Sequence, residues 1–180
     1  MSRLTLPVGK RDHIQGDAKA PVTLVEYGDY ECPHCGHAYP IIKRVQQRMG
    51  NRLSFVFRNF PLNEIHPNAE HAAEAAESAG ANGGEEAFWE MHDLIFENQK
   101  SLGGPTLGRL ASEAGVDADA VLTDLSTQRF RDRVREDFMS GVRSGVNGTP
   151  TFFINGVRYN GPYEEADLVA ELEETLLHSA

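Results

Sequence analysis

The feature that most constrains this chain is its pair of cysteines, Cys32 and Cys35, the only two in the sequence. Two cysteines cannot build the multi-bridge framework that stabilises small proteins without a proper core. The chain must therefore fold around a hydrophobic core, and its 180 residues, 40% of them hydrophobic, are enough for one. We expect a single domain over residues 1–180.

The two cysteines lie between a predicted strand and a predicted helix. Residues 21–30 are rich in β-branched and aromatic side chains, which is typical of a short strand. Pro33 suits the first turn of a helix, and an apolar stripe then continues towards Gly50 as the stop. Residues 53–62 form a second strand-like run. The pattern predicts a β-α-β unit with parallel strands.

The middle of the chain is predicted to be helical. Residues 67–146 divide into five helical segments, and we expect an inserted helical part at about residues 64–128. Trp89 should belong to a helical core. In the last of the five segments, apolar side chains recur every four residues and predict one buried face, formed by Phe130, Val134, Phe138 and Val142.

The C-terminal part returns to β-structure. Residues 151–154 and 157–159 are β-prone and are separated by Asn155-Gly156, a strong signal for a two-residue hairpin turn. A final helix is expected from about Glu164. The whole pattern predicts an α/β protein with a β-α-β unit, a helical insert and an α-β-β-α unit.

The Cys-x-x-Cys spacing indicates thiol-disulfide chemistry. On a helix, Cys32 and Cys35 lie one turn apart on one face and can form a disulfide. Cys32 sits at the helix start, where free N–H groups and the helix dipole favour its thiolate, so Cys32 is the expected nucleophile. Cys35 is expected to be shielded and to resolve mixed disulfides. His34 can add positive charge at the same helix end.

Three acidic residues precede the cysteines. Glu26, in the predicted strand, lies either half-buried beside the cysteines or on the solvent face of the strand. In the buried case its pKa would be raised and it could exchange a proton with Cys35. Asp29 and Glu31 oppose the Cys32 thiolate, an effect weakened by salt screening if both are exposed.

A zinc site is the main alternative for the cysteine pair. It would need four ligands, and without a second Cys-x-x-Cys the histidines His13, His34 or His37 would have to complete it. No nucleotide-binding loop or serine-hydrolase motif is present in the sequence, so we expect neither a metal nor another cofactor. His66 and His71 are interpreted as polar helix-surface residues.

Together, Cys32-Pro33-His34-Cys35 and the stretch from Gly148 to Gly156 resemble the DsbA-type thiol-disulfide oxidoreductases of the thioredoxin fold, over about residues 12–175. The resemblance implies that Cys32 attacks, Cys35 resolves and His34 tunes the redox potential. It further implies that Pro150 is a cis-proline facing the cysteines. Glu26 matches the acidic residue of the family's first core strand, and Thr149 would offer its backbone to an extended substrate beside Pro33 and Pro150.

The expected activity is disulfide exchange with protein or peptide thiols, supported by a redox-recycling partner and with the direction of electron flow open. The alternatives are a zinc- or partner-binding redox switch and a glutathione-dependent transferase or isomerase.

A net charge of −10 argues against nucleic acid as a partner. Without a signal peptide or apolar span in the sequence, we expect a cytoplasmic protein that is not inserted in a membrane. A chain that has lost a leader would be periplasmic or otherwise extracytoplasmic.

Overall fold

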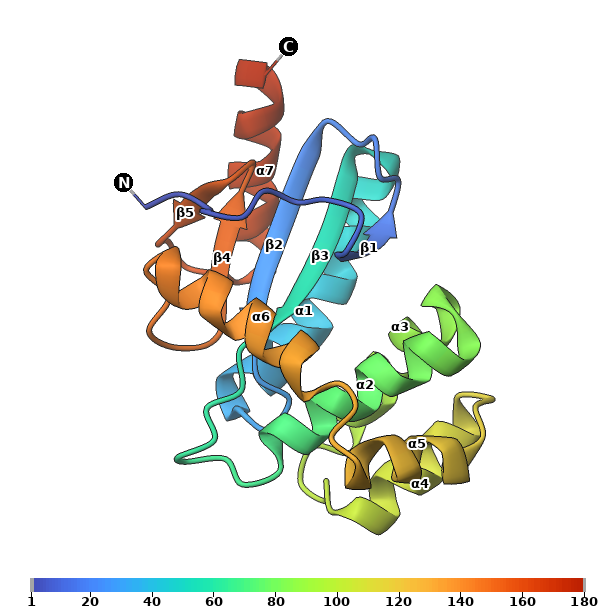
Figure 1. Cartoon of the computed structure of the whole chain (residues 1–180). Coiled ribbons are helices and arrows are strands. Elements are labelled where there is room, and N and C mark those ends of the chain that lie inside the picture. The colour runs from blue at the N-terminus through green and yellow to red at the C-terminus, as the bar shows by residue number, and fades with distance from the viewer. Residues whose placement is uncertain (1, 180) are drawn as a thin grey trace.

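The computed structural model describes residues 2–179, which form a mixed β-sheet with helices on both faces and a group of helices at one end (Figure 1). In chain order the elements are β1 (His13–Gly16), β2 (Val22–Gly28), α1 (Pro33–Met49), the single turn η1 (Gly50–Arg52), β3 (Leu53–Asn59), α2 (Ala69–Gly83), α3 (Glu85–Glu97), α4 (Gly104–Glu113), α5 (Ala118–Ser126), α6 (Arg131–Arg143), β4 (Thr151–Ile154), β5 (Val157–Tyr159) and α7 (Glu165–Ser179).

Within the described residues the strands are ordered β1-β3-β2-β4-β5. β2 and β3 are parallel and are joined through α1, which confirms the predicted β-α-β unit. β4 pairs antiparallel with β2, and β5 with β4. Asn155 and Gly156 form the predicted turn between them, with φ values of 46° and 82° that suit this residue pair.

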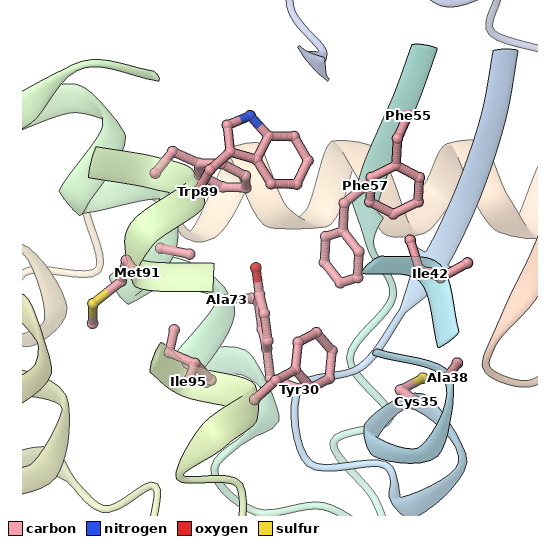
Figure 2. Close-up of a cluster of buried hydrophobic side chains, with 14 of the residues drawn as sticks. Tyr30, Cys35, Ala38, Ile42, Phe55, Phe57, Ala73, Trp89, Met91 and Ile95 are labelled. Carbon is pink, nitrogen blue, oxygen red and sulfur yellow. The ribbon is translucent and has the colours of Figure 1, made fainter. Parts of the chain in front are cut away.

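The central strand β2 separates two cores. Leu24 faces the larger core, which includes α1, α7 and the helices α2–α5, while Val25 and Tyr27 face the smaller core under α6. Figure 2 shows part of the larger core, which extends from Cys35 on α1 through Phe57 on β3 to the side chains of α3. Because β2 is covered on both faces, its side chains are buried whichever way they point.

The predicted helical region consists of five helices in this part of the chain, α2 to α6, and Gly84 separates α2 from α3. Trp89 is buried, which confirms it as a core residue. On α6 the expected apolar face is only partly correct, because Val142 is 45% exposed. α2–α5 fall within about residues 64–128, while α6 packs on the sheet. The division into insert and surrounding fold stays a prediction.

One strand was not predicted from the sequence. β1, with the sequence His-Ile-Gln-Gly, pairs antiparallel with β3 and forms one edge of the sheet. His13 anchors it to the helices, because its Nε2 lies 2.9 Å from Glu77 and its Nδ1 lies 2.8 Å from Glu85. Among the helices of residues 2–179, none has both the length and the apolar character needed to cross a bilayer.

Candidate active site

Cys32 lies at the N-terminal end of α1 and caps it. Its backbone is extended, with φ −68° and ψ 123°, and Pro33 begins the helix. Pro33 fits there because the first helical residue needs no N–H group. The Cys32 carbonyl accepts the first helical hydrogen bond, from the N–H of Gly36 at 3.0 Å. The thiol of Cys32 therefore sits beside the unpaired N–H groups of the first helical turn.

These surroundings lower the pKa of Cys32 to about 5. The largest cause is a hydrogen bond from the Cys35 thiol, and burial opposes it. The main-chain N–H groups of Cys35 and His34 add hydrogen bonds that favour the thiolate, and the neighbouring Thr149 side chain also lowers the pKa. Cys32 is therefore a thiolate at neutral pH, the form of cysteine that acts as a nucleophile.

Cys35 is fully buried one turn further along α1. Burial raises its pKa, as do its hydrogen bond to Cys32 and the charge of Glu26. The N–H of Asp29 donates to Cys35 Sγ at 3.4 Å and favours the thiolate more weakly. The two cysteines thus have opposite pKa shifts, and neither forms a disulfide in this structure.

Glu26 is buried, with 3% of its surface exposed, so of the two sequence-based alternatives the buried one holds. Glu26 lies two positions after Leu24 on β2, so both side chains point to the same face of the sheet, the one covered by α1. Burial, followed by the negative charge of Cys32, raises the pKa of Glu26 to about 8. This carboxyl group is therefore mostly protonated at neutral pH and is electrostatically coupled to Cys32.

The loop between α6 and β4 faces Cys32. The Thr149 carbonyl lies 3.5 Å from Cys32 Sγ. The Thr149–Pro150 peptide bond is cis, as the resemblance implied. Pro33 and His34 are exposed on the other side of Cys32. Four of the predicted site residues, Cys32, Cys35, Glu26 and Thr149, are thus brought together from three separate segments of the chain: the start of α1, β2 and the α6–β4 loop.

The acidic residues before Cys32 are held by hydrogen bonds. Asp29 is buried, and its carboxylate accepts from the N–H of Glu31 at 2.7 Å and lies 2.7 Å from His66 Nδ1. The expectation that His66 is a helix-surface residue is wrong, because this partly buried ring precedes α2 and pairs with Asp29. Glu31 accepts from the N–H of Asn68 at 2.6 Å. These contacts fasten the β3–α2 loop beside the active site.

Two further residues reach the site from distant segments and carry no sequence motif. Gln99, just after α3, donates from Nε2 to the carbonyls of Tyr30 and Cys32. Tyr163, between β5 and α7, has a pKa raised by burial and then by the charges of Cys35 and Cys32. Sequence reasoning missed both, because only the folded chain brings them to the cysteines.

Two of the three histidines invoked for a zinc site are engaged elsewhere. His13 is held by Glu77 and Glu85, and His37 Nε2 lies 3.0 Å from Glu164. Over residues 2–179, no three side chains of His, Cys, Asp or Glu are grouped so that they could hold a metal ion. The zinc alternative therefore gains no support from the arrangement of these side chains.

Comparison with known proteins agrees with this geometry. Residues 9–174 match the model of a family described as thioredoxin. BdbD from Bacillus subtilis, in its oxidised form, superposes with a TM-score of 0.86 at 24% identity, covering 98% of each chain. The α-DsbA1 protein of Wolbachia pipientis has a TM-score of 0.80 at 21% identity, covering 98% of this chain and 96% of that one.

Curated relatives carry a similar sequence inside longer proteins. The Na(+)/H(+) antiporter NhaA 1 of Salinispora arenicola is 45% identical over 161 residues, which are 89% of this chain and 24% of the relative. The antiporter NhaA of Herminiimonas arsenicoxydans is 38% identical over 162 residues, covering 90% of this chain and 25% of that protein. The chain thus spans about a quarter of the length of these relatives.

The sheet order and the position of Cys32 and Cys35 at the start of α1 define a protein of the thioredoxin-like fold that BdbD also has. The chain belongs to the thioredoxin family whose model it matches over residues 9–174.

Proposed function

We propose that this domain oxidises pairs of thiols in proteins or peptides through its Cys-Pro-His-Cys site. The observation that carries the proposal is the contrast between its two sulfurs. The pKa of Cys32 is lowered to about 5, whereas burial raises the pKa of Cys35. One sulfur is therefore a good leaving group and the other returns to a protonated thiol, a division of labour that suits disulfide exchange.

The reaction starts from the Cys32–Cys35 disulfide. A substrate thiolate attacks Cys32 Sγ and forms a substrate–Cys32 disulfide, while the Cys32–Cys35 bond breaks and its electron pair leaves with Cys35. Glu26, protonated below about pH 8, is assigned as the proton donor to this sulfur. In the reverse direction the same carboxylate takes the proton back.

In the second step another substrate thiolate attacks the substrate sulfur of the mixed disulfide. The substrate gains a disulfide, and Cys32 leaves as a thiolate. The substrate has then lost two electrons and the domain has gained them. A redox-recycling partner that provides a disulfide or another two-electron acceptor must take these electrons before the next turnover.

The low pKa of Cys32 also supports the oxidising direction. A stabilised thiolate stabilises the reduced form of the pair, so that the disulfide is easily reduced by substrates. Such a couple acts as an oxidase in an oxidising compartment. The related antiporters join a similar domain to a membrane protein, and this supports a position outside the cytoplasm rather than the cytoplasmic one first expected. Labelling of Cys32 in intact cells by a thiol reagent that cannot cross membranes tests that position.

Substrates are expected to bind as extended chains beside Cys32. The main chain of Thr149, next to Cys32 Sγ, is assigned to pair with such a strand, and Pro33, Pro150 and Tyr163 are assigned the apolar contacts around the sulfur. His34 is assigned a tuning role next to the attacked sulfur. A peptide dithiol should therefore be a better substrate than glutathione at equal thiol concentration.

The proposal is tested by mixing the oxidised domain with a reduced peptide that contains two cysteines. We expect one peptide disulfide per domain oxidised, and none from Cys32→Ser or from a peptide with one cysteine replaced by serine. Failure of the wild-type domain to oxidise the peptide would overturn the proposal. Preferential reaction with glutathione would favour the glutathione-dependent alternative.

A further inference from the structure

The side chain of Gln99 joins the helical part of the molecule to the redox-active turn. Its Nε2 donates hydrogen bonds to the Tyr30 carbonyl at 3.0 Å and to the Cys32 carbonyl at 2.7 Å. The amide thus donates to two carbonyls in the segment that leads into α1. The Cys32 carbonyl is the one that also accepts from Gly36.

Gly36 provides the space for this amide. A Cβ atom built on Gly36 would lie 2.2 Å from Gln99 Oε1 and 2.9 Å from its Cδ, distances that real atoms do not share. Glycine inside a helix destabilises it by about 1 kcal/mol relative to alanine. The close approach of Gln99 gives a physical reason for glycine at this position, one residue after Cys35.

Gln99 itself is held on a fixed support. Its N–H donates to the Phe96 carbonyl at 3.3 Å, in the turn that ends α3. The Phe96 ring packs against Tyr30 at 4.9 Å and stacks on Tyr39 of α1 at 5.2 Å, measured between ring centroids. The end of α3 therefore contacts both the segment before Cys32 and the helix after it.

We infer that Gln99 is a positioning residue for Cys32, through which the helices α2–α5 set the reactivity of the attacking sulfur. Gln99 fixes the main chain of Cys32 through its carbonyl and so keeps Sγ beside the N–H groups of His34 and Cys35. The inference rests on the proposed function, because it concerns the same sulfur. The inference gives the helices α2–α5 a role in setting the reactivity of Cys32, and this role does not depend on contact with the substrate.

The test compares Gln99→Ala and Gln99→Glu with wild type by the rate of Cys32 alkylation as a function of pH. Loss of the amide donors should shift the midpoint upward by about half to one pH unit and slow peptide oxidation about 3- to 10-fold, the effect of one to two ordinary hydrogen bonds. Gln99→Glu should shift it further, because its negative charge faces two carbonyls. Gln47→Ala and Gln47→Glu, at an exposed position on α1, are the matched controls.

Gly36→Ala gives an independent test that keeps Gln99. The new methyl group displaces the far end of a flexible side chain rather than the backbone, so α1 should stay folded. We expect Gly36→Ala to reproduce the shift of Gln99→Ala, and the double variant to show no larger shift than either one. Additive shifts would contradict the inference.

The titration measures the Cys32 thiol directly, so it separates the positioning role of Gln99 from the proposed oxidation of peptides. An unchanged Cys32 titration in Gln99→Ala and Gln99→Glu would overturn the role of Gln99 even if the wild-type domain oxidises the peptide. A wild-type domain that alkylates at low pH but oxidises no peptide would overturn the proposed function instead. A fall in melting temperature without a shifted titration would show a purely structural role and would also overturn the inference.

Discussion

At the scale of single residues, the reactivity of each cysteine depends on which hydrogen-bond donors contact its sulfur. Cys32 lies at the N-terminal end of α1, where main-chain N–H groups have no partner within the helix. Cys35 lies within the helix, where burial is the largest influence on its pKa. Two chemically identical side chains three positions apart therefore acquire different reactivities. The difference comes mainly from the hydrogen bond between the two sulfurs and from the burial of Cys35, and the N–H groups of the first helical turn add to it.

His34 allows the main-chain and side-chain contributions to be separated. Its N–H donates to Cys32, while its ring is exposed. His34→Ala removes only the ring, whereas His34→Pro also removes the N–H at a first-turn position that tolerates proline. We expect the Cys32 pKa to rise slightly in His34→Ala and to rise by about one further unit in His34→Pro. Thiolate absorbance against pH measures both changes. Equal titrations for the two variants would mean that the N–H contributes nothing.

Replacing Glu26 by Gln removes a titratable group without changing its shape. The folded pKa of Glu26 is raised to about 8, so this group stabilises the fold fully below its ordinary pKa and that stability is lost as the pH rises through 8. Glu26→Gln should therefore be more stable than wild type above pH 8, by thermal denaturation. It should also resolve mixed disulfides about 10-fold more slowly, because Gln cannot exchange the proton. Glu90→Gln, at an exposed position, should match wild type in both assays.

At the scale of elements, the docking of α6 on the sheet depends on Gly141. A Cβ atom there would lie 2.8 Å from the Phe60 ring and 3.0 Å from the Tyr27 ring, both buried. Gly141→Ala should destabilise the fold by about 1–3 kcal/mol, since these rings cannot move aside. Denaturant unfolding measures this loss, with Gly104→Ala, where nothing lies within 4 Å, as the control. Equal stability of both variants would show that α6 packs less closely.

The link between β1 and the helices should make stability depend on pH. Burial would lower the pKa of His13, but its hydrogen bonds and charge contacts with Glu77 and Glu85 outweigh burial and raise it. A raised folded pKa means that this stability is full below about pH 6.5 and is lost as the pH rises through the folded value. His13→Gln should remove this part of the pH dependence, while His71→Gln, which is exposed, should keep it. An identical pH profile for His13→Gln and wild type would contradict this account.

Element by element, the sequence predicted what depends on local pattern. The strand before Cys32, the start of α1 at Pro33 and the Asn155-Gly156 turn follow from turn chemistry and periodicity. β1 was missed, because four residues that begin with histidine carry no β-signal of their own. The face on which Glu26 lies could not be decided either. β2 is buried on both sides, so its hydrophobic pattern does not alternate.

At the scale of the whole molecule, the site is assembled by long-range contacts. Asp29 meets His66, and Gln99 meets Cys32, across more than thirty positions of sequence. No spacing rule predicts such pairs, so the sequence indicated the cysteines and the cis-proline loop but not the residues that support them. The supporting residues come from the β3–α2 loop and the end of α3, and each holds one side of the redox-active turn.

The two redox states should differ in how their stability changes with pH. In the reduced form the pKa of Cys32 is lowered to about 5, and this lowered pKa stabilises the fold. The stabilisation is fully present above the ordinary thiol pKa and is lost as the pH falls through 5. The disulfide form has no such group. The melting temperature of the reduced form should therefore rise relative to the oxidised form between pH 4 and pH 9. A screened effect of about 2 kcal/mol corresponds to about 4–8 °C. A constant difference would contradict the lowered pKa.

The most direct test of the central claim, that Cys32 is the sulfur that exchanges with substrate, is mass spectrometry of trapped mixed disulfides. Cys35→Ser and Cys32→Ser are each mixed with a peptide disulfide at pH 6 and quenched with acid. The account predicts a rapid peptide adduct on Cys32 in Cys35→Ser and a far slower one, or none, on Cys35 in Cys32→Ser. Adducts that form on Cys35 as fast as on Cys32 would contradict it.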